Sequence, residues 1–305
     1  MGSIAIGGLP IGKVHCVAPA GDRCGEGAVW HPSEKAVYWT DINRFLIHRY
    51  DEETDAVNSW FFDEPVVALA LTERDDTLLV ALASRLILWE PQTDVRRDHG
   101  FTLNGWPKVR LNDGRADPLG NFWVGSMRNN VNPDGSPGAA GGTDGVLYRI
   151  DSANTHTVFR RDLGIANTLC WSPDLTRFYH ADTLANTICV WDYDAKTGAI
   201  SNERPFFAGF ERGYPDGSAI DSEGYLWNCR FGGQCIVRIA PDGTIDRIIE
   251  MPAQNITTAV FGGNDLKTLY ATSAGAETHA GDRLAGSLFA LRTQTPGLAP
   301  YRVRL

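Results

Sequence analysis

The chain has 305 residues, a formal net charge of −9 at pH 7, 43% hydrophobic residues and 21% charged residues. These proportions are normal for a soluble globular protein. The acidic balance, with no basic run, argues against a nucleic-acid partner, and no stretch approaches the ~18 apolar residues of a membrane span.

The N-terminal segment and the cysteines indicate the domain bounds and the cellular compartment. Residues 1–12 lack a basic segment followed by an apolar core, so we expect a tail rather than a signal peptide, ahead of a single domain over residues 13–305. The six cysteines include no Cys-x-x-Cys pair. Free thiols in a reducing compartment are the simplest interpretation, which predicts a cytoplasmic protein. We separately expect a monomer or a weak homo-oligomer.

A short β unit recurs along the chain. In one copy, the apolar pair Ala219–Ile220 leads into a turn at Asp221–Gly224, and an aromatic-rich strand follows at Tyr225–Cys229. A further strand is expected at Cys235–Ile239, and no helical period occurs in the unit.

The spacing of these units predicts the fold. Equivalent positions are separated by 40, 44, 56, 48 and 43 residues and are occupied by Trp39, Leu79, Trp123, Tyr179, Trp227 and Tyr270. Several strands per repeat at this period indicate a β-propeller, so we predict an all-β, six-bladed propeller of four-stranded antiparallel blades around a metal-containing channel. An irregular β-sandwich would not repeat its turn chemistry in this way. We expect residues 14–18, and equally 301–305, to join the last blade and close the ring.

Polar residues occupy equivalent positions in four of the repeats. Glu26 lies between two glycines, Arg110 and Asn112 come just ahead of a strand expected to begin near Gly114, Asn167 precedes an apolar run, and Asp216 lies in a predicted Pro-Asp-Gly turn. Each comes at the start of the expected innermost strand of its blade. The propeller would therefore bring all of them to one face around the channel. Taken singly, each is more typical of an ordinary turn.

The donors in this set suit a metal ion. The oxygen-bearing side chains of Glu26, Asn167 and Asp216 fit a hard divalent cation with positions left for water or substrate. Calcium is the first expectation, with zinc, magnesium and manganese as alternatives. The absence of histidine at these positions argues against a His-rich zinc site.

One long irregular segment interrupts the repeats. Residues 128–143 are rich in Gly, Asn and Pro, and a connection of this length is usually functional or disordered. We expect it to form a lid over one end of the propeller. The chain contains no Gly-x-Ser-x-Gly elbow, phosphate loop or dinucleotide fingerprint.

Four motifs in this order resemble the family of senescence marker protein (regucalcin), gluconolactonase and luciferin-regenerating enzyme. They lie at Gly25–Trp30, Arg110–Met127, Gly164–Asp174 and Pro215–Trp227. The resemblance implies a six-bladed propeller with one divalent metal in the channel, and hydrolysis of sugar lactones to aldonic acids.

The resemblance also implies roles for single residues. It places Glu26, Asn167 and Asp216 as metal ligands, and Arg110 and Asn112 as contacts to substrate oxygens. The segment after Met127 lacks the acidic residues that some members use to hold substrate hydroxyls, and Arg128 and Asn129 are the substrate-binding candidates there.

The chemistry of ester hydrolysis makes Asp216 our candidate general base. Two other functions remain open. The same scaffold could hydrolyse other esters or organophosphates, or it could be a non-catalytic propeller that binds calcium or a protein partner.

Overall fold

The protein was analysed as a computed structural model, which describes residues 11–276 and 278–305. Its strands form six sheets. Blade one contains β2 (Gly25–His31), β3 (Ala36–Asp41), β4 (Leu46–Asp51) and β5 (Val57–Phe61); blade two contains β6 (Val66–Thr72), β7 (Leu78–Leu82), β8 (Arg85–Glu90) and β9 (Val95–Thr102). Blade three contains β10 (Val109–Ala116), β11 (Phe122–Arg128), β12 (Gly145–Ile150) and β13 (His156–Leu163); blade four contains β14 (Ala166–Trp171), β15 (Arg177–Asp182), β16 (Thr187–Tyr193) and β17 (Ile200–Ala208). Blade five contains β18 (Tyr214–Ile220), β19 (Leu226–Phe231), β20 (Cys235–Ile239) and β21 (Ile245–Glu250); blade six contains β22 (Asn255–Gly262), β23 (Thr268–Ala274), β24 (Leu288–Arg292) and β1 (Val14–Ala18).

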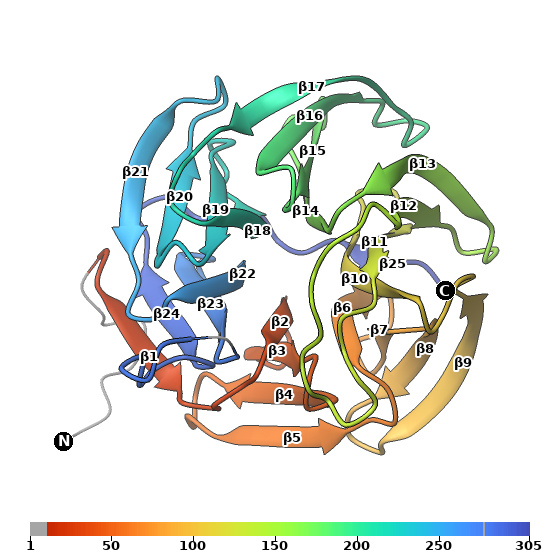
Figure 1. Cartoon of the computed structure of the whole chain (residues 1–305), viewed down its shortest axis with the longest axis horizontal. Helices are drawn as coiled ribbons and strands as arrows, with labels where there is room; N and C mark the ends of the chain where they lie inside the picture. The colour runs from red at the N-terminus through yellow and green to blue at the C-terminus, as the bar shows by residue number, and fades with distance from the viewer. Residues whose placement is uncertain (1–10, 277) are drawn as a thin grey trace.

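The predicted six-bladed propeller is confirmed. The innermost strands β2, β6, β10, β14, β18 and β22 contact one another in sequence and surround the channel, as Figure 1 shows. The part of the chain that the structure describes contains no helix long and apolar enough to cross a membrane.

The recurring turn and aromatic residue hold each other in place. In blade three, Asp117 accepts the backbone N–H groups of Leu119 and Asn121, and its other oxygen accepts Trp123 Nε1 at 2.9 Å. Blade five repeats this contact between Asp221 and Trp227 Nε1, also at 2.9 Å. The repeat visible in the sequence is therefore an Asx turn tied to a buried indole.

The core is divided among the interfaces between blades. One cluster joins Trp123 of blade three to Trp171 and Phe178 of blade four, and the two indoles meet edge to face at 6.1 Å between ring centroids. Burying large apolar side chains between neighbouring sheets is the main stabilising term for such a ring.

The two ends of the chain close the ring differently. β1 pairs with β24 in blade six, which confirms the expectation for residues 14–18. The expectation for residues 301–305 was wrong, because β25 (Arg302–Val303) pairs in parallel with β6 in blade two. β1 already covers the outer edge of β24, whereas the inner edge of β6 offers unpaired backbone groups at the channel. Of the predicted tail, residues 1–10 lie outside the described residues, and Gly12 N donates to Arg292 O.

All six innermost strands carry a register shift near the same level of the channel. The shifts fall between Glu26 and Val29, Val66 and Ala68, Leu111 and Gly114, Asn167 and Leu169, Pro215 and Ser218, and Ile256 and Ala259. The turn expected at Pro215–Gly217 was wrong, because these residues belong to β18. The polar residues lie near the start of their strands. They lie within the strands, where bulges redirect their side chains.

Candidate functional site

A cavity of about 380 Å³ opens at one end of the channel. Its lining includes all five polar residues that the repeat phase had singled out: Glu26, Arg110, Asn112, Asn167 and Asp216. They come from blades one, three, four and five, and each is no more than 8% exposed. The predicted convergence of these side chains is thus present in the structure.

Bulge geometry aims the first carboxylate into the channel. Gly27 follows Glu26 with a φ of 59°, a left-handed conformation that favours glycine. Its N–H donates to Glu26 Oε2 at 2.9 Å. A Cβ on Gly27 would lie 3.0 Å from Ala68 Cα of blade two, so the bulge also depends on close approach of the next blade.

A chain of hydrogen bonds connects three blades beneath the cavity. Arg110 Nη1 donates to Asn112 Oδ1 at 2.7 Å, and Asn112 Nδ2 donates to Asn167 Oδ1 at 3.1 Å. Asn167 Nδ2 in turn donates to Thr183 Oγ1 at 2.9 Å, and that hydroxyl donates to the carbonyl of Pro215 at 2.8 Å. Hydrogen bonds at both its oxygen and its nitrogen therefore fix the orientation of the Asn167 side-chain amide.

The two carboxyl groups are strongly coupled to each other. Burial raises the pKa of Glu26 well above its ordinary value, and the negative charges of Asp216 and Asp113 raise it further. Burial, followed by the charge of Asp113, raises the pKa of Asp216 to about 8. A hydrogen bond joins the Glu26 and Asp216 carboxyls.

The nearby guanidinium is also destabilised by burial. The pKa of Arg110 falls to about 10 because burial outweighs the attraction of Cys24, Glu26 and Asp216. Arg110 remains a cation at neutral pH, and it faces the acid pair from blade three.

This donor set fits a hard divalent cation. Two buried carboxylates that repel each other gain most from a cation between them, and the amide oxygen of Asn167 supplies a neutral third ligand. Among the described residues, no three His, Cys, Asp or Glu side chains group as a metal site. A site built here would combine Glu26, Asp216 and Asn167, as the sequence pattern had suggested.

The two remaining sequence candidates lie away from the cavity. Arg128 is exposed, and its Nε donates to Asp144 Oδ2 at 2.8 Å. Asn129 Nδ2 donates to the carbonyl of Pro107 at 3.0 Å. The next residue, Asn130, lines the cavity instead, and its Oδ1 accepts Arg110 Nη2 at 2.8 Å.

Sequence reasoning could not choose among these three neighbours. Residues 128–143 lie outside the repeats, so their position in the sequence does not indicate which way each side chain points. The cavity also exposes Cys24, which lies two residues before Glu26.

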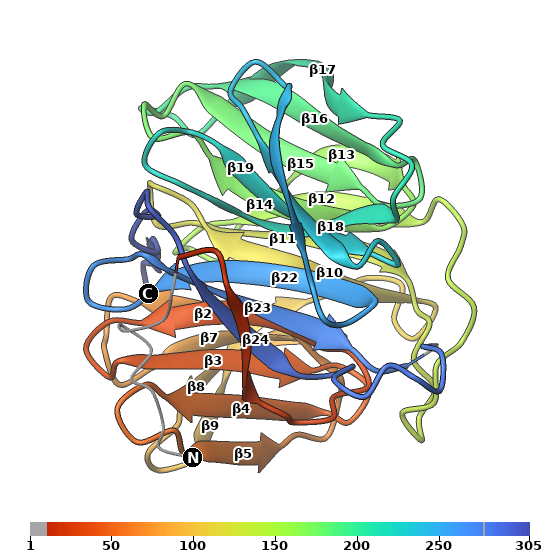
Figure 2. The same ribbon diagram turned by 90° about the vertical axis from the view of Figure 1, so that its left-hand side faces the viewer.

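The irregular segment between β11 and β12 reaches across the mouth of the cavity. Pro137, Gly138 and Ala140 line it, and the carbonyl of Gly135 accepts Asn43 Nδ2 of blade one at 2.9 Å. Figure 1 shows this yellow-green loop running from blade three toward blade one, and Figure 2 shows it on the face opposite the C-terminus.

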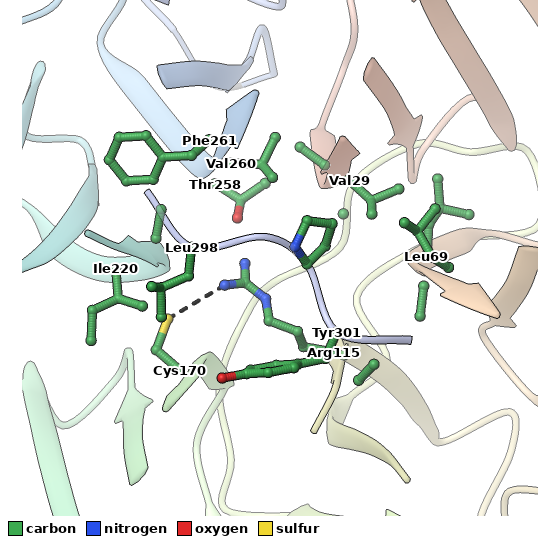
Figure 3. A pocket seen from close by; sticks show the side chains of 18 of the residues that line it. Val29, Leu69, Arg115, Cys170, Ile220, Thr258, Val260, Phe261, Leu298 and Tyr301 are labelled. Atoms are coloured by element: carbon green, nitrogen blue, oxygen red, sulfur yellow. Dashed lines mark hydrogen bonds between the residues drawn. The ribbon is translucent and has the colours of Figure 1, made fainter. Parts of the chain in front are cut away.

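A second, smaller cavity of about 80 Å³ lies at the other end of the channel. Figure 3 shows the chain that carries Leu298 and Tyr301 crossing it. Arg115 Nη1 points toward Cys170 Sγ at 3.4 Å. We refer to this space as the lower cavity and to the larger one as the upper cavity.

Known proteins share both the sequence and the architecture. The SMP-30/Gluconolactonase/LRE-like region matches residues 24–275. The chain is 35% identical to the pentonolactonase XacC of Haloferax volcanii, over 92% of this chain and 94% of that protein. It is 34% identical to the L-arabinolactonase of Azospirillum brasilense, over 96% of each.

A solved structure extends the comparison. The calcium-binding protein regucalcin from Agrobacterium tumefaciens superposes with a TM-score of 0.89 at 27% identity, covering 97% of this chain and 99% of that one. The matched region contains Glu26, Arg110, Asn112, Asn167 and Asp216. The chain therefore belongs to the SMP-30/gluconolactonase/LRE-like family.

Proposed function

We propose that this protein hydrolyses a sugar lactone to the corresponding aldonic acid, using one divalent cation held by Glu26, Asn167 and Asp216. The observation that carries the proposal is the buried acid pair with a fixed amide beside it, at the floor of the 380 Å³ upper cavity. Relatives over 30% identical that are named pentonolactonase and L-arabinolactonase support the choice of substrate class.

Lactone hydrolysis has chemical requirements that the residues of this site could meet. A lactone is a cyclic ester, so water must add to its carbonyl carbon, the ring C–O bond must break, and the ring oxygen must leave as a hydroxyl. A divalent cation at this site would polarise the carbonyl and lower the pKa of a water molecule. Asp216 is the proposed general base that accepts a proton from the attacking water and returns it to the ring oxygen as the ring C–O bond breaks.

The neighbouring polar residues suit the binding of substrate oxygens. Arg110 is held by Asn112 and by Asn130, so its charge is fixed at the upper cavity. We assign substrate contacts to these three residues rather than to Arg128 and Asn129, whose side chains contact Asp144 and Pro107 outside the cavity.

Other residues that line the upper cavity could contact the sugar ring away from the lactone carbonyl. Tyr214, Phe231 and Leu184 line the upper cavity, and Tyr214 is 51% exposed. The rings of Tyr214 and Phe231 can pack against the C–H faces of a sugar ring. We propose that the loop over residues 129–144 covers the substrate from the other side.

The test uses purified protein stripped of metal and reloaded separately with calcium, zinc, magnesium or manganese. We expect gluconolactone or a pentonolactone to be hydrolysed only by reloaded protein, and faster than an aryl ester. Asp216→Asn should lower the rate at least about a hundredfold, in the range typical of a lost general base.

A matched control lies in the same chain. Asp242 occupies the same Pro-Asp-Gly tripeptide in an exposed turn, where it accepts Thr244 N at 3.0 Å. Asp242→Asn should retain full activity. Faster turnover of an aryl ester or organophosphate would favour the general esterase, and metal binding without any turnover would favour a binding propeller.

A further inference from the structure

A third buried carboxylate lies behind the acid pair. Asp113 follows Asn112 in the bulged part of β10, where the register shifts between Leu111 and Gly114, and it is 5% exposed. It lines the lower cavity, whereas its neighbour Asn112 lines the upper one. The bulge thus sends two consecutive polar side chains to the two ends of the channel.

The backbone around Asp113 ties it to the next blade. Its carboxylate accepts the N–H groups of Gly114 and Thr168. Thr168 directly follows Asn167 and has a φ of 55°, an unusual conformation for a residue with a branched side chain. Asp113 therefore helps to hold the bulge from which the Asn167 amide projects.

One oxygen of this carboxylate remains unused. Among the described residues, Asp113 Oδ2 has no hydrogen-bond partner although it is buried. Arg115 offsets part of its charge from the lower cavity, but that guanidinium contacts Cys170 Sγ (Figure 3). A buried carboxylate left in this state is costly unless a cation compensates it.

The charge of Asp113 acts on both proposed acidic ligands. It is the largest charge effect on Asp216 and the second largest on Glu26. In a metal-free site, repulsion from the Asp113 charge disfavours the ionised forms of both Glu26 and Asp216. A divalent cation between Glu26 and Asp216 would relieve this repulsion, so Asp113 can strengthen binding without occupying a ligand position.

We propose that Asp113 is a positioning residue of the metal centre, whose charge increases affinity for a divalent cation and whose bond to Thr168 N holds Asn167 in place. This inference rests on the proposed function, because it assumes that Glu26, Asn167 and Asp216 bind the cation.

The decisive variant is Asp113→Asn, which has nearly the same shape and keeps an oxygen for Thr168 N–H but removes the charge. Calorimetric titration of the metal-free full chain with Mn²⁺, and separately with Ca²⁺, should give at least tenfold weaker binding. The metal-free variant should melt at a higher temperature than metal-free wild type, because a like charge has been removed. The increase in melting temperature on adding metal should shrink.

Asp117→Asn is the matched control. Asp117 follows the same strand, is fully buried and accepts backbone N–H groups, but it belongs to the turn locked to Trp123. This variant should melt lower and bind metal as wild type does.

The possible outcomes distinguish failure of the Asp113 role from failure of the proposed metal site. If wild type binds metal and Asp113→Asn binds it equally tightly, or if the variant only melts lower as Asp117→Asn does, the role of Asp113 is refuted. If wild type binds neither Mn²⁺ nor Ca²⁺, the proposed metal site itself fails, and the inference falls with it.

Discussion

The same tripeptide has different structural roles in this chain, depending on its position in the repeat. The tripeptide Pro-Asp-Gly occurs at 133–135, 215–217 and 241–243. The first and third form turns in which Asp134 and Asp242 accept a backbone N–H two residues on. The middle copy lies inside β18 and sends Asp216 into the upper cavity. Local sequence cannot separate these cases, whereas phase within the repeat singled out Asp216.

Asp41, Asp182 and Asp221 occupy other positions in the repeat. Their carboxylates accept backbone N–H groups, which is a structural role. Asp41 accepts the N–H groups of Arg23 and Cys24. Asp182 accepts the N–H groups of Gly164 and Leu184, and Asp221 accepts those of Glu223 and Tyr225.

The coupled acid pair predicts how the stability of the metal-free protein depends on pH. The pKa of Asp216 is raised to about 8 in the folded chain, so the folded state retains a proton that the unfolded state has already released. The resulting stability is fully present below the ordinary carboxyl pKa and is lost as pH rises through about 8.

Urea unfolding of metal-free protein at several values between pH 6.5 and 8.5 measures this effect. We expect the free energy of unfolding to fall by on the order of 1 kcal/mol per pH unit up to about pH 8, and then to level off. The fall should be smaller in Asp216→Asn and in metal-loaded wild type. A free energy that stays constant or rises over this range would contradict the assignment.

At the scale of the strand, the bulge is the element that makes the site. The innermost strands are buried along almost their whole length, and their existence and order could be predicted from the repeat of short apolar runs followed by turns. The bulges could not be predicted, because each depends on contact with the neighbouring blade. Thr168 Oγ1, for example, donates to the carbonyl of Asp216 at 2.6 Å across the blade interface. Such contacts leave no local pattern in the sequence.

Gly217 provides the test at this scale. A Cβ built there would lie 2.1 Å from Thr258 Oγ1 and 2.9 Å from Thr258 Cα on β22. Gly217→Ala should therefore lower the free energy of unfolding by about 2 kcal/mol, as overpacking of a tight core does, and should weaken metal binding by displacing Asp216.

A double-mutant cycle with Thr258→Gly checks the cause of that loss. If the clash is responsible, the two changes together should cost less than the sum of their separate effects. Additive costs, or unchanged metal affinity in Gly217→Ala, would show that the contact between these bulges does not position Asp216.

The whole molecule is a ring with two unlike faces. The loop of residues 129–144 lies over one end of the channel (Figure 2). The C-terminal segment crosses the other end before β25 joins β6 (Figure 1). The repeat predicted the ring and the convergence of five polar residues. It did not predict the path of residues 296–303, because pairing along the channel edge depends on which edges the other strands leave free.

The central claim is that strands distant in sequence form one cation site in the upper cavity. Anomalous diffraction from crystals of the full chain soaked in Mn²⁺ tests it most directly. We predict one strong peak about 2.0 to 2.6 Å from oxygens of Glu26, Asn167 and Asp216, the usual range for such ligands. A channel without a peak under saturating Mn²⁺, or a peak bound by other side chains, would contradict it.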